Sequence, residues 1–335
     1  MLDIQLTMRG REEILMSEKM KGWQFTKTHE PLVLVEKDIP KAKPGYVVIE
    51  VKACGLCHSD VGALEDPGWM DIIQVFPVIM GHEISGVITE VGEGVEGFKV
   101  GDRVAVCPMQ PDGDGPGYGR DGGYATHTTA PAEYLIPIPD EVDFVQAAAA
   151  TDAGMTSYHA VVGQGGVKEG TKVGIIGIGG LGTLGNQFAI EKGAQVYVAS
   201  RKESAREKAL KAGAYKAAES ILEFKDEGLE VIIDFAGANK TTAEALEAVA
   251  PGGKVVVVGM ASLETTINTS SLILKEASII GSVGGTPQDI KEILDLMKEG
   301  KVSIDTEEIS FEEVPEGLQR LKEGKVTSRL VMTFD

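Results

Sequence analysis

The clearest pattern in the chain is an alternation of short apolar runs with amphipathic segments in its second half. The amphipathic segments include residues 203–211 and 241–250. The apolar runs lie at 173–178, 195–199, 231–235, 254–258 and 278–283. This spacing is typical of strand–helix–strand units, so it predicts a parallel sheet covered by helices.

The first third of the chain is instead rich in β-branched residues. Its runs at 33–35, 46–51 and 84–91 are separated by glycine and proline, which predicts strands joined by turns. A polar, glycine-rich loop follows at 111–123.

Helical patterning flanks the predicted parallel sheet. Residues 145–162 include four consecutive alanines, which are good helix formers. We expect a final helix at 289–299, and after it a short tail that contains a strand.

A glycine-rich turn follows the strand expected at 173–178. It reads G-x-G-x-x-G and precedes a helix that we expect to open at Thr183. The first glycine permits a tight bend, the second lets a diphosphate approach, and the third allows close helix–strand packing. We therefore predict dinucleotide contacts from Gly177, Gly179, Gly180, Leu181 and Gly182.

The end of the next strand bears on the choice of cofactor. An NAD site normally has an acidic residue there, but this chain has Ser200, Arg201 and Lys202. A hydroxyl and two cations suit a 2′-phosphate, so we expect NADP(H) to be favoured over NAD(H). The alternative is a capping box between Ser200 and Glu203, with the two cations in a solvated first turn.

Charge and composition exclude several classes of protein. With 51 acidic and 32 basic residues, the net charge is −19, which argues against nucleic acid. No apolar stretch approaches the roughly 18 residues of a membrane-spanning helix. The three cysteines are too few for a disulfide framework, so we expect a cytoplasmic protein. Residues 1–19 lack the apolar region of a secretory signal, and we expect an N-terminal extension that catalysis does not need.

Two segments of the first half carry metal-binding residue types, Cys57-His58-Ser59-Asp60 and Gly81-His82-Glu83. Residues 54–58 also match the C-x-x-C-H pattern of haem attachment and contain a C-x-x-C pair. Haem attachment requires export, and a zinc ribbon requires a second C-x-x-C. Both therefore remain minor alternatives.

Together these segments resemble the zinc-dependent medium-chain alcohol dehydrogenases. The resemblance rests on CGLCHSD (54–60), GHEISGVITEVGEGV (81–95), GDRV (101–104), GGYA (122–125), DAGMTSYHA (152–160) and GIGGLG (177–182). It implies an α/β protein with a GroES-like, β-rich catalytic domain over 20–155 and 285–335. A Rossmann domain, a doubly wound parallel sheet, would interrupt it over 156–284.

The resemblance also assigns one catalytic zinc ion to Cys57, His82 and a third ligand, here Asp152, as in several secondary-alcohol dehydrogenases of the family. A thiolate, an imidazole and a carboxylate offset the charge of zinc and leave a fourth position open. Asp60 and Glu83 resemble the carboxylates that support such ligands, with an ordinary buried ion pair as the alternative.

Two departures from the family pattern matter. The lobe with four cysteines that binds a structural zinc is missing, because only Cys107 lies in that region. The histidine that relays the proton in many members is replaced by Gly62. We therefore expect one zinc per chain, and a proton that leaves from Ser59 through ribose hydroxyls and water. His58 is expected near the pyrophosphate.

The remaining site residues follow from the same resemblance. Thr156, Gly259 and Val283 match positions that line the nicotinamide. Arg329 resembles a phosphate-contacting arginine, with a solvated tail charge as the alternative. Trp69 and Met155 are candidates for the substrate pocket, with core packing as the alternative.

The implied reaction is hydride transfer between a secondary, aromatic or aliphatic alcohol, or its carbonyl product, and NADP(H). Zinc would acidify the alcohol, and Ser59 would accept the first proton. A polyol or sugar dehydrogenase, a zinc-free quinone or enoyl reductase, a non-catalytic NADPH-binding protein and a haem electron carrier are the alternatives. The family also implies a homodimer or homotetramer.

Overall fold

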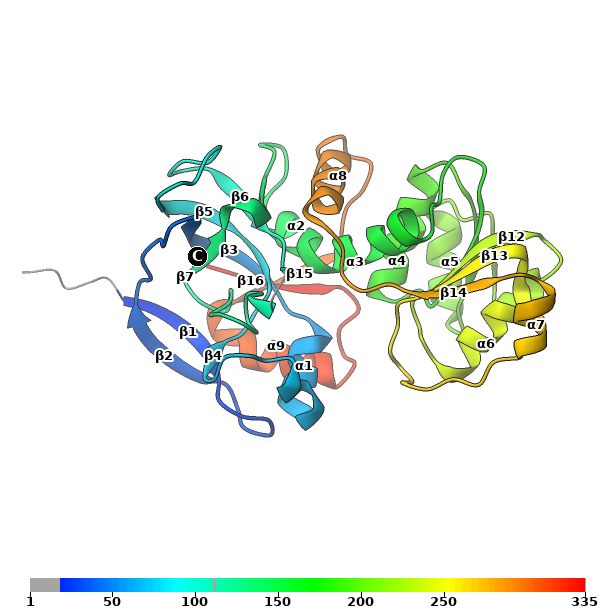
Figure 1. Cartoon of the computed structure of the whole chain (residues 1–335), viewed down its shortest axis with the longest axis horizontal. Coiled ribbons are helices and arrows are strands. Elements are labelled where there is room, and N and C mark those ends of the chain that lie inside the picture. Colours follow the sequence, from blue (N-terminus) through cyan, green and yellow to red (C-terminus); the bar gives the residue numbers. More distant parts are fainter. Residues whose placement is uncertain (1–18, 111–112, 335) are drawn as a thin grey trace, which may run out of the picture.

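The structure, a computed structural model, describes residues 19–110 and 113–334, and the extension expected at 1–19 falls almost wholly outside them. Two sheet-based halves lie side by side, joined by a helical segment (Figure 1). No helix among the described residues is both long and apolar enough to cross a membrane.

The first half holds two sheets. A three-stranded sheet has the order β2-β1-β4, and a seven-stranded sheet has the order β15-β16-β3-β5-β6-β8, with β7 also paired to β3. The strands are β1 (Lys19–Phe25), β2 (Val33–Asp38), β3 (Tyr46–Gly55), β4 (Val78–Ile79), β5 (Glu83–Val91), β6 (Arg103–Val106), β7 (His127–Pro131), β8 (Leu135–Pro137), β15 (Thr306–Ser310) and β16 (Arg329–Thr333). The C-terminal tail thus returns to the first half, and β16 pairs antiparallel with β3.

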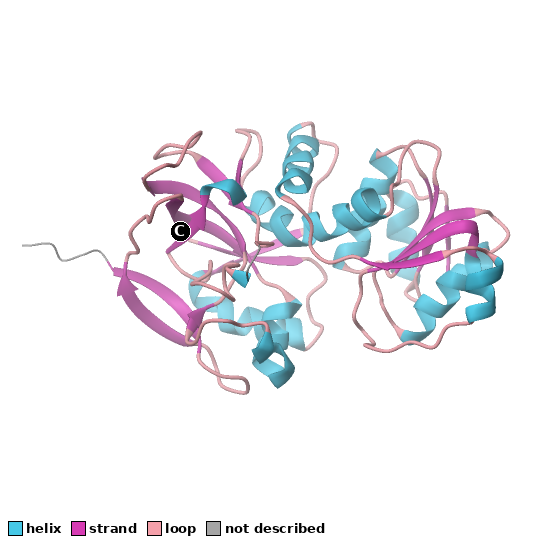
Figure 2. Ribbon diagram, in the orientation of Figure 1, coloured by secondary structure: helices cyan, strands magenta, loops and turns pink. Residues whose placement is uncertain are grey.

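The second half is a six-stranded parallel sheet of order β11-β10-β9-β12-β13-β14. Its strands are β9 (Lys172–Ile176), β10 (Gln195–Ala199), β11 (Lys216–Ala218), β12 (Leu229–Asp234), β13 (Val249–Val257) and β14 (Ser278–Gly281). Helices cover both faces (Figure 2). Strands β10 and β11 are added on one side of β9, and β12, β13 and β14 on the other. The order of strands therefore changes direction between β9 and β12, as in a doubly wound fold.

The helices differ from the expectations at several points. They are α1 (His58–Glu65), α2 (Phe144–Ala149), α3 (Met155–Tyr158), α4 (Gly180–Glu191), α5 (Glu203–Lys211), α6 (Asn239–Ala248), α7 (Thr269–Leu274), α8 (Pro287–Lys298) and α9 (Val314–Lys322). The expectation that 289–299 is the final helix was wrong, because α9 follows it. Its buried Val314, Leu318 and Leu321 repeat at helical spacing after a proline-marked start, a signal that the sequence does contain.

The glycine-rich turn also differs in detail. Helix α4 begins at Gly180, three residues before the expected Thr183, because β9 already ends at Ile176. The helix therefore starts inside the glycine motif, which brings its N-terminal amides closer to the turn.

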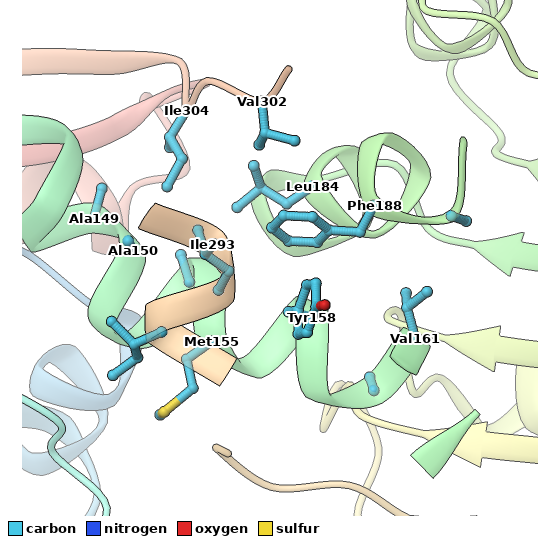
Figure 3. Packing of buried hydrophobic residues seen from close by; sticks show 14 of the residues in the cluster. Ala149, Ala150, Met155, Tyr158, Val161, Leu184, Phe188, Ile293, Val302 and Ile304 are labelled. Atoms are coloured by element: carbon cyan, nitrogen blue, oxygen red, sulfur yellow. The ribbon is translucent and has the colours of Figure 1, made fainter. Parts of the chain in front are cut away.

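A shared apolar core joins the two halves. The rings of Tyr158 and Phe188 are nearly perpendicular, at 86°, with 5.1 Å between centroids, and Ile293 of α8 belongs to the same buried cluster (Figure 3). Core packing thus continues through α3, α4 and α8, which fixes the halves relative to each other. The domain boundaries expected at 155 and 285 stay a prediction.

Candidate metal and cofactor site

Backbone pairing brings the two metal-binding segments together. Strands β3 and β5 are antiparallel, with Gly55 opposite Glu83. Cys57, the residue before α1, and His82, just before β5, therefore lie at the same end of the sheet. Asp152 reaches them from a π-helical turn, Ala150–Gly154, between α2 and α3. Such turns are rare and recur at functional sites.

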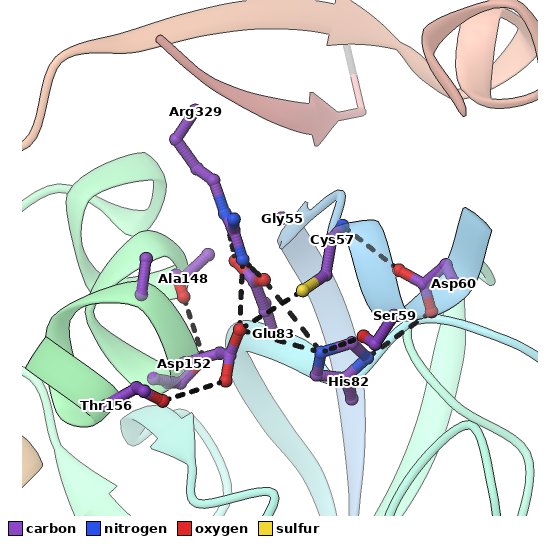
Figure 4. Close-up of polar contacts among 12 residues, drawn as sticks. Gly55, Cys57, Ser59, Asp60, His82, Glu83, Ala148, Asp152, Thr156 and Arg329 are labelled. Atoms are coloured by element: carbon purple, nitrogen blue, oxygen red, sulfur yellow. Dashed lines mark hydrogen bonds and ion pairs between the residues drawn. The ribbon is translucent and has the colours of Figure 1, made fainter. Parts of the chain in front are cut away.

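Four potential ligand atoms converge at this point (Figure 4). One atom each from Cys57, His82, Glu83 and Asp152 lies within 4.8 Å of all the others. Cys57 Sγ is 3.4 Å from Asp152 Oδ2, which is 3.8 Å from His82 Nε2. Glu83 Oε1 is 3.9 Å from the same imidazole nitrogen.

The far side of the imidazole is held by a buried carboxylate. Asp60 Oδ1 lies 3.4 Å from His82 Nδ1, an ion-pair distance without good hydrogen-bond geometry. The other oxygen of Asp60 accepts from the Tyr124 hydroxyl at 2.7 Å and from the Cys57 amide at 3.1 Å. Sequence reasoning missed Tyr124, although it lies in the GGYA segment that carried part of the resemblance.

Arg329 lies inside this cluster. Its Nε donates to Glu83 Oε2 at 2.9 Å and its Nη2 to Asp152 Oδ2 at 3.1 Å. The arginine side chain is only 15% exposed. The alternative of a solvated tail charge is therefore wrong. Thr156 supports the same carboxylate by donating to Asp152 Oδ1 at 3.3 Å.

The electrostatics of the cluster favour a cation. Burial lowers the pKa of His82, but Tyr118, Asp60 and Asp152 raise it, and the net pKa lies well above the usual range. Burial raises the pKa of Asp152, whereas His82, Cys57 and Thr156 lower it to a value below the usual range. Both directions show that the neighbouring groups favour positive charge on or beside the imidazole. A soft thiolate, an imidazole and carboxylates form a donor set that fits zinc.

A cavity of about 290 Å³ adjoins the cluster. Cys57 and Asp152 open onto it, and the residues that line it include five of the predicted cofactor or catalytic residues: His58, Thr156, Gly180, Leu181 and Arg329. Burial and the charge of Arg329 lower the pKa of His58, so this imidazole tends to be neutral.

The glycines of the turn have the expected local roles. Gly177 has φ +86°, a conformation that favours glycine, and a side chain on Gly182 would collide with the Gly177 carbonyl. Nothing lies within 4 Å of a Cβ built on Gly179 or Gly180. The first and third glycines therefore shape the turn, whereas the middle pair leaves open space beside the cavity.

Other predicted residues lie away from the walls of the cavity. Ser200 follows β10, and Arg201 and Lys202 are exposed beside it. Lys202 is the N-cap of α5 and makes no side-chain cap, so the alternative capping box of Ser200 with Glu203 is not formed. Gly259 follows β13, and Val283 follows β14 with 79% of its surface exposed.

The two candidates for the substrate pocket, Met155 and Trp69, have different surroundings. Met155 is fully buried and contacts Cys107 at 3.8 Å between sulfur atoms. Trp69 packs on Gly62, where a Cβ would lie 2.6 Å from the indole. The place of the relay histidine in the family is thus filled by the indole ring.

Comparisons with known proteins match the same two halves. Residues 43–140 match the model of the alcohol dehydrogenase GroES-like domain, and residues 180–299 match the zinc-binding dehydrogenase model. An alcohol dehydrogenase of Geobacillus stearothermophilus is 34% identical, over 93% of this chain and 98% of its own length.

Solved structures agree with these matches. AibC superposes with a TM-score of 0.88 at 29% identity, covering 96% of this chain and 97% of its own. An acetophenone reductase from Geotrichum candidum, solved in complex with NAD, gives a TM-score of 0.84 at 32% identity, covering 96% and 98%.

The protein combines a GroES-like domain, a Rossmann sheet and a group of potential metal ligands. This combination is that of an alcohol dehydrogenase, a class of oxidoreductase. The chain belongs to the zinc-dependent medium-chain alcohol dehydrogenase family.

Proposed function

We propose that this chain is a single-zinc, NADP(H)-preferring dehydrogenase of secondary alcohols, with Cys57, His82 and Asp152 as its metal ligands. The observation that carries the proposal is the convergence of these side chains beside the cavity lined by Gly180 and Leu181. Glu83 lies within reach of the same position, and Arg329 pairs with the carboxylates of both Glu83 and Asp152.

The proposal of one zinc per chain rests on the donor groups. Among the described residues, this is the one group of three or more such side chains with metal-binding geometry. Cys107 is buried beside Met155 rather than among other thiols. Two tightly bound zinc ions per chain, found by elemental analysis, would contradict this part.

The chain's own residues supply the path of the proton. When bound, zinc contributes Lewis acidity toward the substrate oxygen, and the nicotinamide accepts the hydride. The Ser59 hydroxyl lies 3.5 Å from His82 Nε2, on the side where the ligand atoms converge. This distance supports the proposal that Ser59 accepts the alcohol proton. Trp69 covers Gly62, so residue 62 offers no side chain to relay the proton, and ribose hydroxyls and water would have to carry it onward when the cofactor is bound.

The preference for NADP(H) depends on the exposed cations after β10. Arg201 and Lys202 are free of a capping role and accessible to a 2′-phosphate. Replacing both by alanine should raise the KM for NADPH about tenfold and leave the KM for NADH unchanged. Equal efficiency of the unmodified enzyme with both cofactors would remove the preference.

A secondary alcohol is supported by the similarity to an enzyme named for reducing acetophenone, a ketone. A polyol or sugar dehydrogenase shares the proposed metal, and a zinc-free quinone or enoyl reductase shares the architecture. Rates with primary, secondary, benzylic and polyhydric alcohols, measured with both cofactors and with and without a chelator, separate the three. Chelator-resistant reduction of a quinone or an enoyl compound would favour the last.

A second copy of the chain is the proposed partner. Strand β14 is an edge of the parallel sheet, and Ile273, Leu274 and Val283 beside it are 70%, 82% and 79% exposed. Exposed apolar groups at an open strand edge favour pairing with another sheet. Sedimentation should give a dimer or tetramer, and a charged residue in place of Leu274 should shift it toward monomer.

A further inference from the structure

One aromatic side chain that the proposed mechanism does not use lies against His82, a proposed metal ligand. The ring of Tyr118 is 5.5 Å from the ring of His82, between centroids, at an angle of 46°. Its hydroxyl lies within hydrogen-bonding reach of the Ser59 side chain. Ser59 Oγ in turn lies 3.5 Å from His82 Nε2. Tyr118 therefore touches both the proposed proton acceptor and a proposed ligand.

The loop that carries Tyr118 is fixed by Arg120. This guanidinium donates to the carbonyl of Asp114, to the carbonyl of Thr129 at 2.8 Å and to Gln110 Oε1 at 2.8 Å. Its side chain is only 11% exposed. Asp114 also accepts from the Tyr46 hydroxyl at 2.7 Å. The described part of the loop is thus held by a buried cation and its oxygen partners.

The backbone at Tyr118 contacts the segment that leads to His82. The Tyr118 carbonyl accepts from the Gln74 amide at 3.0 Å. A Cβ at Gly117, which has φ +80°, would lie 3.1 Å from the backbone of Gly81. The backbone of Tyr118 and its neighbour Gly117 are therefore packed against residues that precede His82 in the chain.

We propose that Tyr118 is a positioning residue: its ring sets the plane of the His82 imidazole, and its hydroxyl sets the orientation of Ser59. The inference rests on the proposed function for the role of Ser59 and stands independently of it for the role of His82. Replacing a side chain that orients a metal ligand typically lowers metal affinity or activity by about 10- to 100-fold.

Two substitutions separate the two roles. Tyr118→Phe keeps the ring and removes the hydroxyl, so kcat should fall about tenfold while the KM for NADPH and the affinity for Co²⁺ stay unchanged. Tyr118→Leu also removes the ring, so the affinity for Co²⁺ should fall about tenfold and the visible spectrum of the Co²⁺-loaded protein should shift. Tyr215→Phe is the matched control, because Tyr215 is 55% exposed on the other half of the molecule.

The outcomes distinguish this inference from the proposed function. If no alcohol is oxidised by the unmodified protein but Tyr118→Leu still weakens Co²⁺ binding, the proposed function fails and the positioning of His82 stands. If both variants fold and match the unmodified protein in kcat and in Co²⁺ affinity, the inference is overturned. If Tyr118→Leu does not fold, an unchanged kcat in Tyr118→Phe overturns the role of the hydroxyl, and a lowered kcat supports it.

Discussion

Each half of the molecule contains a fully buried carboxylate, but the surroundings of the two differ. At the end of β12 in the Rossmann half, one oxygen of Asp234 accepts from the amides of Ala236 and Gly237 at 3.0 and 2.9 Å. The other accepts from the hydroxyls of Thr241 and Thr242 at 2.8 Å each. Four neutral donors thus satisfy the charge of Asp234.

Asp60 in the catalytic half is satisfied on one side only. Its Oδ1 faces His82 Nδ1 at 3.4 Å without a hydrogen bond, while Glu83 and Asp152 add further negative charge nearby. Arg329 offsets part of that charge. Buried charges that lack full compensation are costly. Asp234 is therefore satisfied by neutral donors alone, whereas Asp60 belongs to a group of buried carboxylates whose negative charge is only partly offset.

The largest effect expected from this difference is the loss of the metal in Cys57→Ser. Removing the thiolate leaves one imidazole and carboxylates, a poorer set for zinc. Lewis acidity is worth several kcal/mol at the transition state, so kcat/KM should fall at least about a thousandfold. Steady-state rates and the zinc content of the purified protein measure the change.

Cys107→Ser is the matched control, because Cys107 is equally a free thiol but lies beside Met155 and not among the ligands. It should keep its zinc. Full zinc content and activity in Cys57→Ser would contradict the proposal that the zinc ion binds at Cys57.

The next largest effect is expected in the Rossmann half, where the proposed cofactor site is formed by the backbone of the glycine-rich turn. Gly179→Ala puts a methyl into open space beside the cavity, with φ −101° that alanine tolerates. Its Tm should be unchanged, while the Kd for the cofactor should rise about tenfold or more, because the diphosphate approaches there.

Gly182→Ala provides the contrasting variant, because its methyl would meet the Gly177 carbonyl. It should lower the Tm as well as weaken cofactor binding. Calorimetry and fluorescence titration measure both. A Gly179→Ala variant that binds cofactor normally would remove the middle glycine from the site.

The same contrast explains how much could be predicted from the sequence. The turn at 177–182 is contiguous, and its flanking strand and helix follow from local periodicity, so its residues could be named from the pattern. The ligands at 57, 82 and 152 are separated by long stretches of chain. Only the family resemblance joined them, and their convergence depends on the register of β3 with β5.

Other features depend on long-range contacts or were missed in the sequence. Tyr118 lies in a polar, glycine-rich segment whose conformation depends on Arg120 and on contacts with residues 74 and 81. The place of Arg329 depends on the return of the tail to β3, a long-range pairing. Helix α9 did carry a periodic signal, but it is short and follows a predicted final helix.

A change of pH provides an intermediate test. Because the pKa of His82 in the metal-free chain is raised, its proton stabilises that form below the unfolded value of ~6.5, and this contribution is lost as the pH rises through the folded value. Zinc needs the neutral imidazole, so its affinity should fall about tenfold for each unit of pH lowered below the folded pKa.

The measurement compares Tm for zinc-loaded and chelator-treated protein between pH 6 and 8. The difference should widen as the pH rises, since ligand stabilisation grows with affinity. A difference that stays constant, or narrows, would show that no proton on His82 competes with the metal.

The smallest effect on the chemistry is expected for Asp234→Asn. The amide oxygen still accepts from Ala236 and Gly237, but the amide nitrogen replaces the acceptor of two threonine hydroxyls. The free energy of unfolding should therefore fall by about 1–3 kcal/mol. Zinc content and kcat should stay unchanged, in contrast to Asp152→Asn, which removes a proposed ligand. Denaturant titration and metal analysis of both variants test the contrast. Loss of zinc in Asp234→Asn would contradict the comparison, because it would show that Asp234, like Asp60, affects metal binding.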